Sequence, residues 1–421
     1  MVSSINVLML FKMNVIKMSN SEIKIGIICP GDFIKRITYG GAIGFVENIL
    51  NNLEISAIVF GYSVSDTPCG KLMFINSRIN FIAFGKIDYN SLIPARLKNF
   101  IDYIIHRNYI MKSGCDVLYI HSPEVTLPFI FFNKKIPVIY HQHGSANPLS
   151  KSKFLWARNS LMQITFDLFL KVVHRRANWT IDIDKICFEQ ARRNGASEKT
   201  SLLMNAVDIE KFCISMDYRM KMRSFHSLDM EQIAVLFVGR IEEVKRVDLI
   251  IDAFAFLKND SMKFRLFLAG DGTLRKQFEE YASRKGLQPV VTFLGNISHE
   301  ELPLYYNMAD VVVLPSDMEG VPMVLLEAMS CGTPVIASSV GGIPDIVSNG
   351  KNGILLDTVT SESLAIAISE VNERSFSRQI VAESVFHLST KEFLKNLYMI
   401  IDNVMQSKNG DNPRRDICNA H

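Results

Sequence analysis

Residues 310–338 read "DVVVLPSDMEGVPMVLLEAMSCGTPVIAS", and this stretch decides the fold. The β-branched run at its start predicts a buried parallel strand, and the apolar run at its end predicts another. Between them, Pro322 favours the start of a helix and Gly332 favours its end. We therefore expect a strand, a loop, a helix over residues 322–331 and a second strand, which is the repeating unit of an α/β fold.

Two glutamates in this stretch, Glu319 and Glu327, lie eight positions apart. Glu319 falls on the loop before the expected helix, and Glu327 falls more than one turn inside it. Because ligands of open parallel sheets bind beyond the carboxyl ends of the strands, both carboxylates are expected near a crevice. The alternative is a loop charge followed by one polar position on a half-buried helix.

The alternation of apolar strands and amphipathic helices continues on both sides of this stretch, and it predicts an α/β protein with parallel sheets. Strands are expected near residues 23–29, 55–60, 79–84, 116–120, 136–143, 178–183, 200–204, 232–239, 264–270, 290–295, 310–315, 334–338 and 353–356. The expected parts are an N-terminal extension (1–21), an N-terminal domain (22–207), a linker (208–231), a C-terminal domain (232–389), a last helix (about 390–405) and a polar tail (406–421).

The composition fits an ordinary globular protein. Of 421 residues, 48% are hydrophobic and 21% are charged, and the formal net charge of +3 predicts no bulk affinity for nucleic acid. The seven cysteines form no CxxC pair, so we expect free thiols in a reducing cytoplasm. No apolar run reaches the length of a transmembrane helix, and residues 1–20 lack the basic start and the cleavage site of a signal peptide.

Basic and glycine residues follow two strands of the C-terminal half. The stretch "FVGRIEEVKRVD" places Gly239 and Arg240 at a strand end and Lys245 at a helix start. A basic pair and helix amides at such a junction can neutralise a diphosphate. In "AGDGTLR", Gly270 and Gly272 permit close approach of the backbone to a ligand. The alternatives are solvated surface charges and a plain turn.

The N-terminal half offers a glycine loop and a pair of histidines. In "YGGAIGFVENIL", Gly40, Gly41 and Gly44 lead into a helix, but the next strand ends without the acidic residue that a dinucleotide-binding fingerprint requires. In "VIYHQHGSA", His141 and His143 end a strand and share one face by strand alternation. A ligand-facing role competes here with a structural one.

Metal and nucleophile chemistry find less support in the sequence. Asp182 and Asp184 could hold a divalent cation, but Asp184 stands where a helix cap belongs, so we expect a cap and no metal site. The chain has no GxSxG motif. Cys331 stands at a helix end without an obvious base, which favours a buried, inert thiol.

Taken together, these motifs resemble those of the retaining GT-B glycosyltransferases of family GT4, in the glycosyltransferase group 1 superfamily. The resemblance covers roughly residues 22–405 and is most specific in "FVGRIEEVKRVDLIIDAF", "AGDGTLR" and the long stretch "VTFLGNISHEELPLYYNMADVVVLPSDMEGVPMVLLEAMSCGTPVIASSVGGIPDIV". It implies two Rossmann-like domains facing each other across a cleft, with the last helix crossing back to the N-terminal domain. Two positions depart from the family pattern: Ala206, where glycine is common, and Asp184, where serine is common.

The resemblance also implies roles for particular residues. Glu319 would contact hydroxyls of the donor sugar, and Glu327 would hold the ribose hydroxyls of the nucleotide. Arg240 and Lys245 would stabilise the diphosphate leaving group, and His143 would lie near the donor sugar. Further donor-binding positions would be Gly239, Gly270, Gly272, Asn296, Gly320, Val321, Met323 and Val324, with Gly40 and Gly41 in a phosphate and acceptor loop.

The function expected from the resemblance is transfer of a sugar from a UDP- or GDP-type nucleotide sugar to a glycan or lipid-linked acceptor, with retention and without cofactor or metal. By analogy, the pathway would be bacterial surface polysaccharide synthesis. A cytoplasmic enzyme is expected, with the inner face of the membrane as a partner of segments 94–112 and 151–176; the alternative is two helices with charged outer faces. Competing functions are a sugar-nucleotide epimerase, a phosphorylase, or a non-catalytic nucleotide-sugar-binding subunit.

Overall fold

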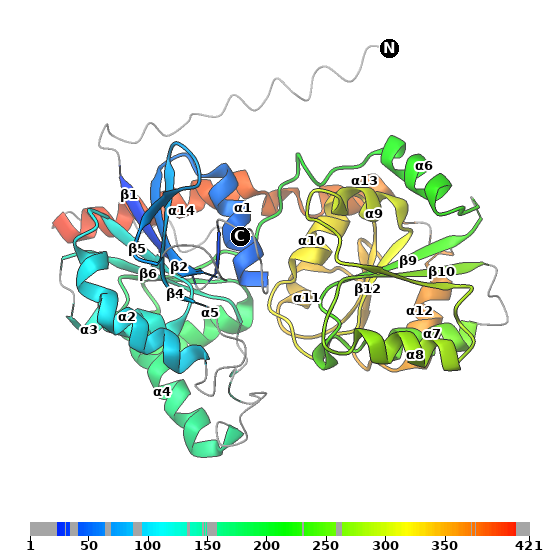
Figure 1. The fold of residues 1–421 in the computed structure, drawn as a ribbon, viewed down its shortest axis with the longest axis horizontal. Coiled ribbons are helices and arrows are strands. Elements are labelled where there is room, and N and C mark those ends of the chain that lie inside the picture. The colour runs from blue at the N-terminus through cyan, green and yellow to red at the C-terminus, as the bar shows by residue number, and fades with distance from the viewer. Residues whose placement is uncertain are drawn as a thin grey trace, which may run out of the picture.

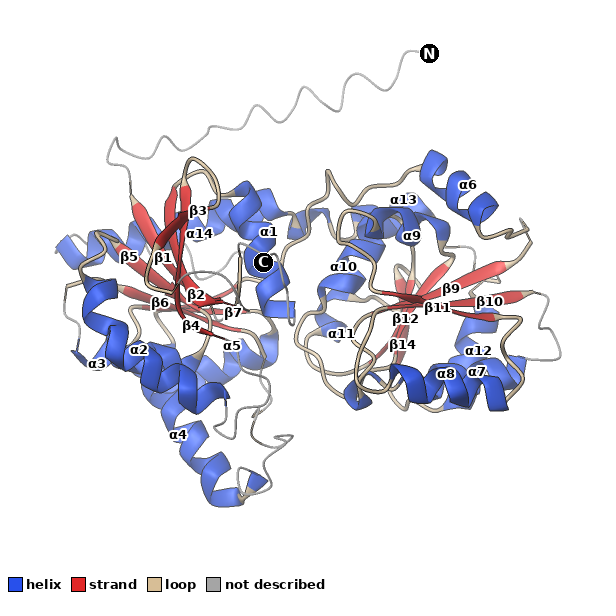
Figure 2. Cartoon of the chain, in the orientation of Figure 1, coloured by secondary structure: helices blue, strands red, loops and turns tan. Residues whose placement is uncertain are grey.

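The computed structural model describes residues 23–29, 31–33, 41–63, 69–86, 95–132, 135–144, 147, 149, 158–229, 231–257, 263–371, 373–374 and 376–409. The expected N-terminal extension, Gly40 and the end of the polar tail lie outside these residues. Figure 1 shows two domains side by side, the N-terminal one coloured blue to green together with the red last helix of the chain, and the C-terminal one green to orange. Figure 2 shows that each consists of helices packed around a twisted sheet.

An eight-stranded sheet forms the centre of the N-terminal domain, in the order β3-β4-β2-β1-β5-β6-β7-β8. Its neighbours pair in parallel except β3, which pairs antiparallel with β4. The strands are β1 (Lys24–Ile28), β2 (Ser56–Ser63), β3 (Leu72–Phe74), β4 (Ile79–Lys86), β5 (Val117–Ile120), β6 (Val138–Gln142), β7 (Trp179–Asp182) and β8 (Thr200–Leu202). All but β3 were expected from the sequence.

Helices cover both faces of this sheet. One face packs against α1 and α14 in a cluster that includes Phe45, Val46 and Leu397. The other face packs against α2 and α3 in a cluster that includes Tyr103 and Phe129. The helices of this domain are α1 (Gly41–Asn52), α2 (Ala95–Met111), α3 (Pro123–Phe132), α4 (Ser160–Arg176), α5 (Lys185–Ala191) and, from the end of the chain, α14 (Thr390–Asn409).

The C-terminal domain contains a six-stranded parallel sheet in the order β11-β10-β9-β12-β13-β14. Numbered within the domain, this order is 3-2-1-4-5-6, the arrangement of a doubly wound nucleotide-binding fold. The strands are β9 (Ile233–Val238), β10 (Phe264–Ala269), β11 (Val291–Gly295), β12 (Val311–Leu314), β13 (Val335–Ser338) and β14 (Gly353–Leu356). The expected strands are confirmed in all six places, because parallel strands covered on both faces require nearly continuous apolar runs.

The helices of the C-terminal domain follow its strands. They are α7 (Val247–Phe256), α8 (Arg275–Arg284), α9 (Leu302–Met308), α10 (Met323–Ser330), α11 (Ile343–Ile346), α12 (Ser361–Glu370) and α13 (Arg378–Glu383). Helix α10 is the one expected over residues 322–331, with Pro322 at its N-cap and Gly332, at φ 76°, just beyond its end. Among the described residues, no helix is both long and apolar enough to cross a membrane.

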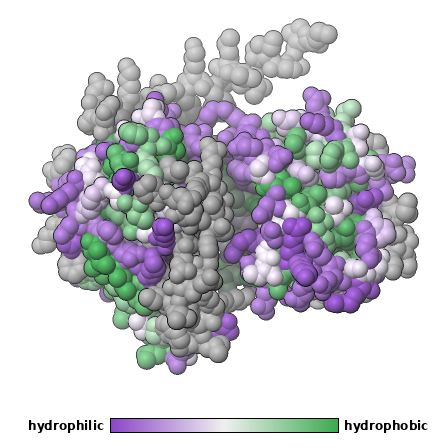
Figure 3. Space-filling view, in the orientation of Figure 1, coloured by the Kyte–Doolittle hydropathy of each residue, from purple (hydrophilic) through white to green (hydrophobic). Residues whose placement is uncertain are grey.

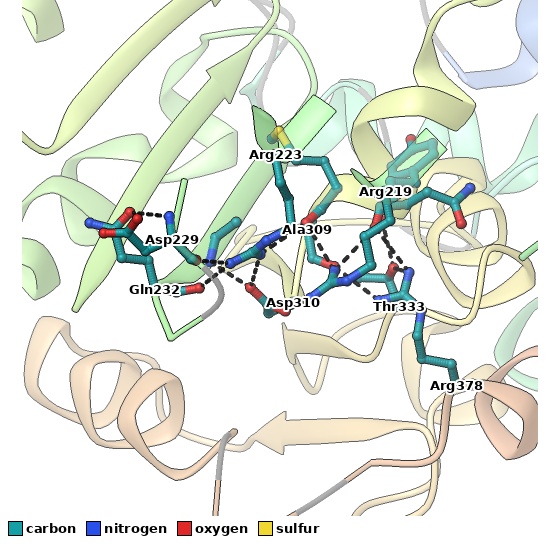
Figure 4. A network of polar contacts seen from close by, with 12 residues as sticks. Arg219, Arg223, Asp229, Gln232, Ala309, Asp310, Thr333 and Arg378 are labelled. Carbon is teal, nitrogen blue, oxygen red and sulfur yellow. Dashed lines mark hydrogen bonds and ion pairs between the residues drawn. The ribbon is translucent and has the colours of Figure 1, made fainter. Parts of the chain in front are cut away.

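The segment expected to be a linker contains α6 (Met216–Phe225), so a linker does not describe residues 216–225. Ser215 caps the helix by accepting from the Tyr218 amide, and α6 packs against α9. Figure 4 shows the polar network beneath it, in which Arg219 and Arg223 donate to the two carboxylate oxygens of Asp310 at 2.5 and 2.9 Å.

The same network closes the end of α9. Arg219 donates to the carbonyls of residues 307, 308 and 309, which have no partner within the helix. Arg378 donates to the Ala309 carbonyl and to the Thr333 hydroxyl, at 3.2 and 2.9 Å. Burial among these groups lowers the pKa of Arg378 to about 10, because desolvation penalises its charge. These contacts attach α6 and α13 to the C-terminal domain.

The chain passes between the domains twice, and the two crossings lie side by side. The Val207 amide donates to the Leu388 carbonyl at 2.9 Å, and the Thr390 amide donates to the Val207 carbonyl at 3.0 Å. Helix α14 then packs on the N-terminal domain, where the resemblance places the last helix; it extends to Asn409 rather than to about residue 405.

Candidate active site

A pocket of about 330 Å³ lies at the carboxyl ends of β9, β10, β11 and β12. The strand order reverses between β9 and β12, and such a switch point is where open α/β sheets bind ligands. Residues that the sequence analysis assigned to the donor site form much of the wall: Gly239, Arg240, Lys245, Gly270, Asn296, Glu319, Met323 and Val324.

An ion pair joins the two sides of the switch point. Lys245, which follows β9, donates from Nζ to Oε1 of Glu319, which follows β12, at 2.5 Å. Only 18% of the lysine side chain and 10% of the glutamate side chain are exposed. Charges this poorly hydrated interact more strongly than a surface pair would.

The backbone before α7 positions Lys245. Residues 243–245 form a single 3-10 turn, and Arg246 follows in the left-handed region at φ 51°, which is unfavourable for a residue with a side chain. Arg246 is held there by ion pairs to Asp248 and Asp317 at 2.9 and 3.3 Å. The Asp317 amide also donates to the Val244 carbonyl at 2.9 Å, so the lysine turn and the glutamate loop are attached to each other.

Arg240 lies at the pocket wall with 59% of its side chain exposed, and its guanidinium is 3.8 Å from Glu242. This contact is too long for a strong ion pair, so the guanidinium can turn toward an anion in the pocket without breaking one. Arg240 and Lys245 therefore give one wall of the pocket two cationic groups.

Glu327 does not line this pocket. It is buried in α10, where Oε2 accepts from the Tyr306 hydroxyl at 2.8 Å and Oε1 accepts from His299 Nε2 at 3.0 Å. A carboxylate offers about four acceptor sites, so these two bonds fix its orientation without using its full capacity. Neither partner of Glu327 could be anticipated from the sequence, because Tyr306 and His299 lie on an earlier helix and turn.

The glycines expected to approach a ligand approach neighbouring backbone instead. A Cβ on Gly270, at φ 136°, would lie 1.9 Å from the Gly239 carbonyl oxygen, and a Cβ on Gly272 would lie 2.3 Å from the Ile241 carbonyl oxygen. These positions pack the β9 and β10 loops together, and Gly270 also lines the pocket. Gly341, at φ 56°, supports the glutamate loop in the same way, against the Glu319 carbonyl.

The two domains touch next to the pocket. Gly320 lies against the His143 carbonyl oxygen, which would be 2.9 Å from an added Cβ. The Val321 carbonyl accepts from Asn205 Nδ2 at 2.6 Å, and Asp345 accepts from the Lys185 amide at 3.0 Å. Gly320 and Val321 therefore contribute to the domain contact rather than to the pocket wall. Gly41 is the first residue of α1.

His143 belongs to a buried cluster at the carboxyl ends of β5 and β6. Its Nε2 lies 2.7 Å from His121 Nδ1, and His141 Nδ1 lies 2.5 Å from the Tyr119 hydroxyl. Burial lowers the pKa of His143 to about 4 and the pKa values of His121 and His141 well below their usual range. The imidazoles are therefore neutral at neutral pH. His121 was not anticipated, although it follows a strand as His143 does.

These histidines could also hold a metal ion. Among the described residues, His121, His141 and His143 form a group whose ring nitrogens lie within 4.8 Å of one another, and the Nε2 atoms of His121 and His141 are buried without a hydrogen-bond partner. Neutral imidazoles suit zinc, copper and nickel. The rings of His121 and His143 are stacked at 23°, however, rather than radiating from a common centre.

The expected helix cap at Asp184 is confirmed. Its Oδ1 accepts from the Cys187 amide at 2.7 Å at the start of α5, and the side chain is fully buried. Asp182 accepts from the Thr200 hydroxyl at 2.5 Å, and burial raises its pKa to about 7. Burial also raises the pKa of Cys331, as expected for an inert thiol.

We expect Asp182→Asn to gain stability at alkaline pH relative to wild type. The folded-state pKa of Asp182 is about 7 against an ordinary 3.8, so the wild-type fold favours the protonated acid and loses stability as pH rises through 7. From pH 5 to pH 8, the free energy of unfolding of the variant should rise by roughly 2–3 kcal/mol relative to that of wild type. Urea unfolding at both pH values measures this difference, and an unchanged difference would show that folding does not raise the pKa of Asp182.

Comparison with known proteins agrees with this geometry. The two parallel-sheet domains define the GT-B class of fold: sucrose-phosphate synthase from Thermosynechococcus elongatus superposes with a TM-score of 0.76 at 21% identity, covering 91% of this chain and 100% of that chain. HepE of Anabaena, solved in complex with UDP-glucose, superposes with a TM-score of 0.67 at 20% identity, covering 90% and 99%. Residues 219–384 match the family model described as glycosyl transferases group 1.

A sequence relative extends the match over most of the chain. The uncharacterized glycosyltransferase MJ1178 of Methanocaldococcus jannaschii is 28% identical over 356 residues, which cover 84% of this chain and 90% of the relative. For other relatives, at 31–33% identity, the match spans only 45–48% of the relative's own length. The residues that line the pocket lie within the range that the family model matches.

Proposed function

We propose that this protein is a retaining glycosyltransferase that moves a sugar from a UDP- or GDP-type nucleotide sugar to a glycan or lipid-linked acceptor, in the synthesis of bacterial surface polysaccharide. The ion pair between Lys245 and Glu319 carries the proposal. A cation suited to a phosphate and a carboxylate suited to sugar hydroxyls meet at the switch point, where the bond between sugar and phosphate of a bound donor would lie. The UDP-glucose and UDP bound in the solved structures of HepE support this class of substrate.

The proposed reaction needs no enzymic nucleophile. The acceptor hydroxyl attacks the anomeric carbon on the face from which the diphosphate departs, and the departing phosphate oxygen accepts the hydroxyl proton. Lys245 and Arg240 stabilise the negative charge that grows on the diphosphate as the bond breaks. Glu319 orients the sugar, and the neutral His143 offers it a hydrogen bond without a competing charge.

An assay with a panel of nucleotide sugars tests the proposal. Thermal shift identifies the donor that stabilises the protein, and transfer to an extract of glycans and lipid carriers, followed by NMR of the anomeric linkage, identifies the reaction. Transfer with an α-linked product from an α-linked donor supports retention. Epimerised donor, or phosphorolysis of a glycan, would replace the proposal with one of the competing enzymes, and donor binding without turnover would indicate a binding subunit.

We expect turnover to persist in EDTA. The residues proposed for catalysis neutralise the diphosphate with side-chain cations, so no divalent ion is needed at the phosphates. The same assay with and without EDTA, on wild type and on His121→Gln, measures this. Loss of turnover in EDTA that Mn²⁺ or Zn²⁺ restores in wild type but not in His121→Gln would instead assign a metal to the histidine cluster.

The two glutamates should divide the donor between them. Glu327→Ala removes a contact shared by the donor and the free nucleotide diphosphate, so both should bind about 1.5–3 kcal/mol more weakly, or roughly 10–150-fold. Glu319→Ala should not weaken the free diphosphate, because that ligand has no sugar and because the change releases Lys245 from its ion pair. It should instead reduce turnover, since the sugar loses its orientation.

Isothermal titration of both variants with the nucleotide diphosphate, beside steady-state rates, separates these roles. Tyr306→Phe is the matched control, because it removes one bond to Glu327 and keeps the carboxylate. Its affinity should lie between wild type and Glu327→Ala. Equal weakening of the free diphosphate by Glu319→Ala and Glu327→Ala would show that the two carboxylates do not divide the donor.

A further inference from the structure

Two helices of the N-terminal domain turn apolar stripes toward solvent. On α2 the exposed positions recur at helical spacing, and the same holds on α4, where Leu161 is 70% exposed and Ile164 is 63% exposed. With one residue of α3, these stripes form a surface that we call the α2–α4 surface: Leu97, Ile101, Ile104, Ile105, Tyr109, Phe131, Leu161, Ile164, Leu168 and Phe169. In Figure 3, green hydrophobic surface gathers over the part of this domain that contains α2.

A groove joins the two stripes. It has a volume of about 290 Å³, and both Ile104 from α2 and Leu168 from α4 line it. Helix α3 contributes Leu127, Pro128 and Phe131 between them, and Thr165 is the one polar residue of the lining. The α2–α4 surface is therefore continuous across three helices, and monomeric soluble proteins rarely expose so extended an apolar surface without a partner.

The last helix of the same domain shows the ordinary arrangement. The apolar stripe of α14 is buried on the sheet, through Leu394, Leu397, Ile401 and their neighbours. On α2 and α4 the exposed faces carry apolar residues beside charged ones such as Arg96, Asp167 and Arg175, so the alternative of charged outer faces describes these helices only in part. Their buried faces, which include Tyr103 and Val173, already supply the packing on the domain.

Cationic side chains border the α2–α4 surface. The Arg176 guanidinium lies 4.6 Å from the centre of the Phe131 ring, and the Arg96 guanidinium lies 5.7 Å from that of Phe166. Each helix has three basic residues against one acidic residue: Arg96, Lys98 and Arg107 against Asp102 on α2, and Lys171, Arg175 and Arg176 against Asp167 on α4. On α2, Arg96 forms an ion pair with Glu124 of α3 and Lys98 forms one with Asp102, each at 2.9 Å, so most of the unpaired positive charge comes from α4. Apolar residues flanked by cations match the boundary between acyl chains and anionic headgroups.

We propose that the α2–α4 surface binds the surface of an anionic lipid bilayer. A second copy of the chain fits it less well, because a twofold contact would place the cationic border of one copy against that of the other. The purpose of the binding rests on the proposed function: it brings the acceptor side of the enzyme to an acceptor held in the membrane. The loop that follows His143 supports this, since Asn147 donates to Gln163 and Asp167 of α4, at 3.0 and 2.9 Å.

Co-sedimentation of the full chain with vesicles tests this proposal. The vesicles contain phosphatidylcholine alone or mixed with phosphatidylglycerol. Ile164→Glu/Leu168→Glu adds two charges to the stripe and should lower partitioning into anionic vesicles at least about tenfold. The matched control, Met220→Glu/Ile366→Glu, adds the same charges at positions 65% and 58% exposed in the C-terminal domain and should stay within about twofold of wild type.

Lys171→Ala/Arg176→Ala should reduce binding to anionic vesicles more than to neutral ones, because it removes charge and little apolar area. Failure of wild type to bind anionic vesicles, or equal losses in the stripe variant and the control, would overturn the proposal. The proposal would also be overturned if light scattering showed that the wild type is a dimer, the stripe variant a monomer, and the wild type bound no lipid. In that case the surface would be a dimer interface. The affinity of the same variants for the nucleotide diphosphate should not change. If the wild type bound vesicles but transferred no sugar from any nucleotide sugar, that result would count against the proposed function and not against membrane binding.

Discussion

Replacing Lys245 with alanine is expected to lower kcat by about 10²–10³ while changing the KM for the donor far less. In the proposed reaction the lysine ammonium faces a diphosphate whose charge grows as the bond to the sugar breaks, so its contribution would be larger in the transition state than in the bound donor. Arg240→Ala should act in the same direction, because its guanidinium lies on the same pocket wall. Steady-state kinetics with the identified donor measures both.

Lys245→Ala also removes the ion-pair partner of Glu319, whose carboxylate is nearly buried. The lysine change must therefore also be measured in a variant that lacks Glu319. In a Glu319→Ala background, the lysine change should still lower kcat by about 10² if it acts on the leaving group. If its only role is to hold Glu319, the double variant should match Glu319→Ala alone, which would contradict the proposed mechanism. Lys276→Ala, on the exposed side of α8, serves as the charge control.

Asp310→Ala is expected to destabilise the C-terminal domain by about 3–5 kcal/mol. Asp310 accepts from Arg219, Arg223 and the Ala234 amide, and only 3% of the Arg223 side chain is exposed. Without the carboxylate, two guanidinium groups face each other in poorly hydrated surroundings, and α6 loses its two ion pairs to the residue before β12. Charge removal at a buried network costs far more than at the surface, where exposed pairs contribute about 0.2–1 kcal/mol.

Urea unfolding followed by far-UV circular dichroism checks this value. Both tryptophans lie in the N-terminal half, at positions 156 and 179, so their fluorescence would not report the affected domain. Glu370→Ala is the matched control, since it removes one carboxylate from an exposed pair with Arg374. A loss at Asp310 no larger than that of Glu370→Ala would show that the network in Figure 4 adds little to stability.

The sequence predicted the sheets well because their physical signature is local. Strand β12 is buried at all four positions, and its four apolar residues predict a buried strand without knowledge of any other part of the chain. Strand β3 was missed, since three residues at a sheet edge give too short a pattern. Helix α6 was missed for another reason: Arg219 and Arg223 occupy the face where apolar residues would signal burial, and their partner Asp310 lies 87–91 residues further along the chain.

The sequence indicated which residues line the candidate site, but not which of them contact one another. Lys245 and Glu319 each stand at a strand end, which the sequence reveals, but their ion pair spans 74 positions. Gly270 predicted that the backbone would come close to another group, and only the structure shows that this group is the Gly239 carbonyl. His121 follows β5 as His143 follows β6, so the signal that identified one histidine was present for the other.

The paired crossings between the domains have a mechanical consequence. Val207 is bonded to both Leu388 and Thr390, so the outgoing and returning chains form a short two-stranded strap rather than two independent tethers. A strap of this kind resists shear, because sliding one chain past the other breaks the backbone hydrogen bonds between them. It can still bend as a unit. Opening and closing of the domains around a donor should therefore follow a single rotation axis, with the ion pair and the histidine cluster returning to the same register in every cycle.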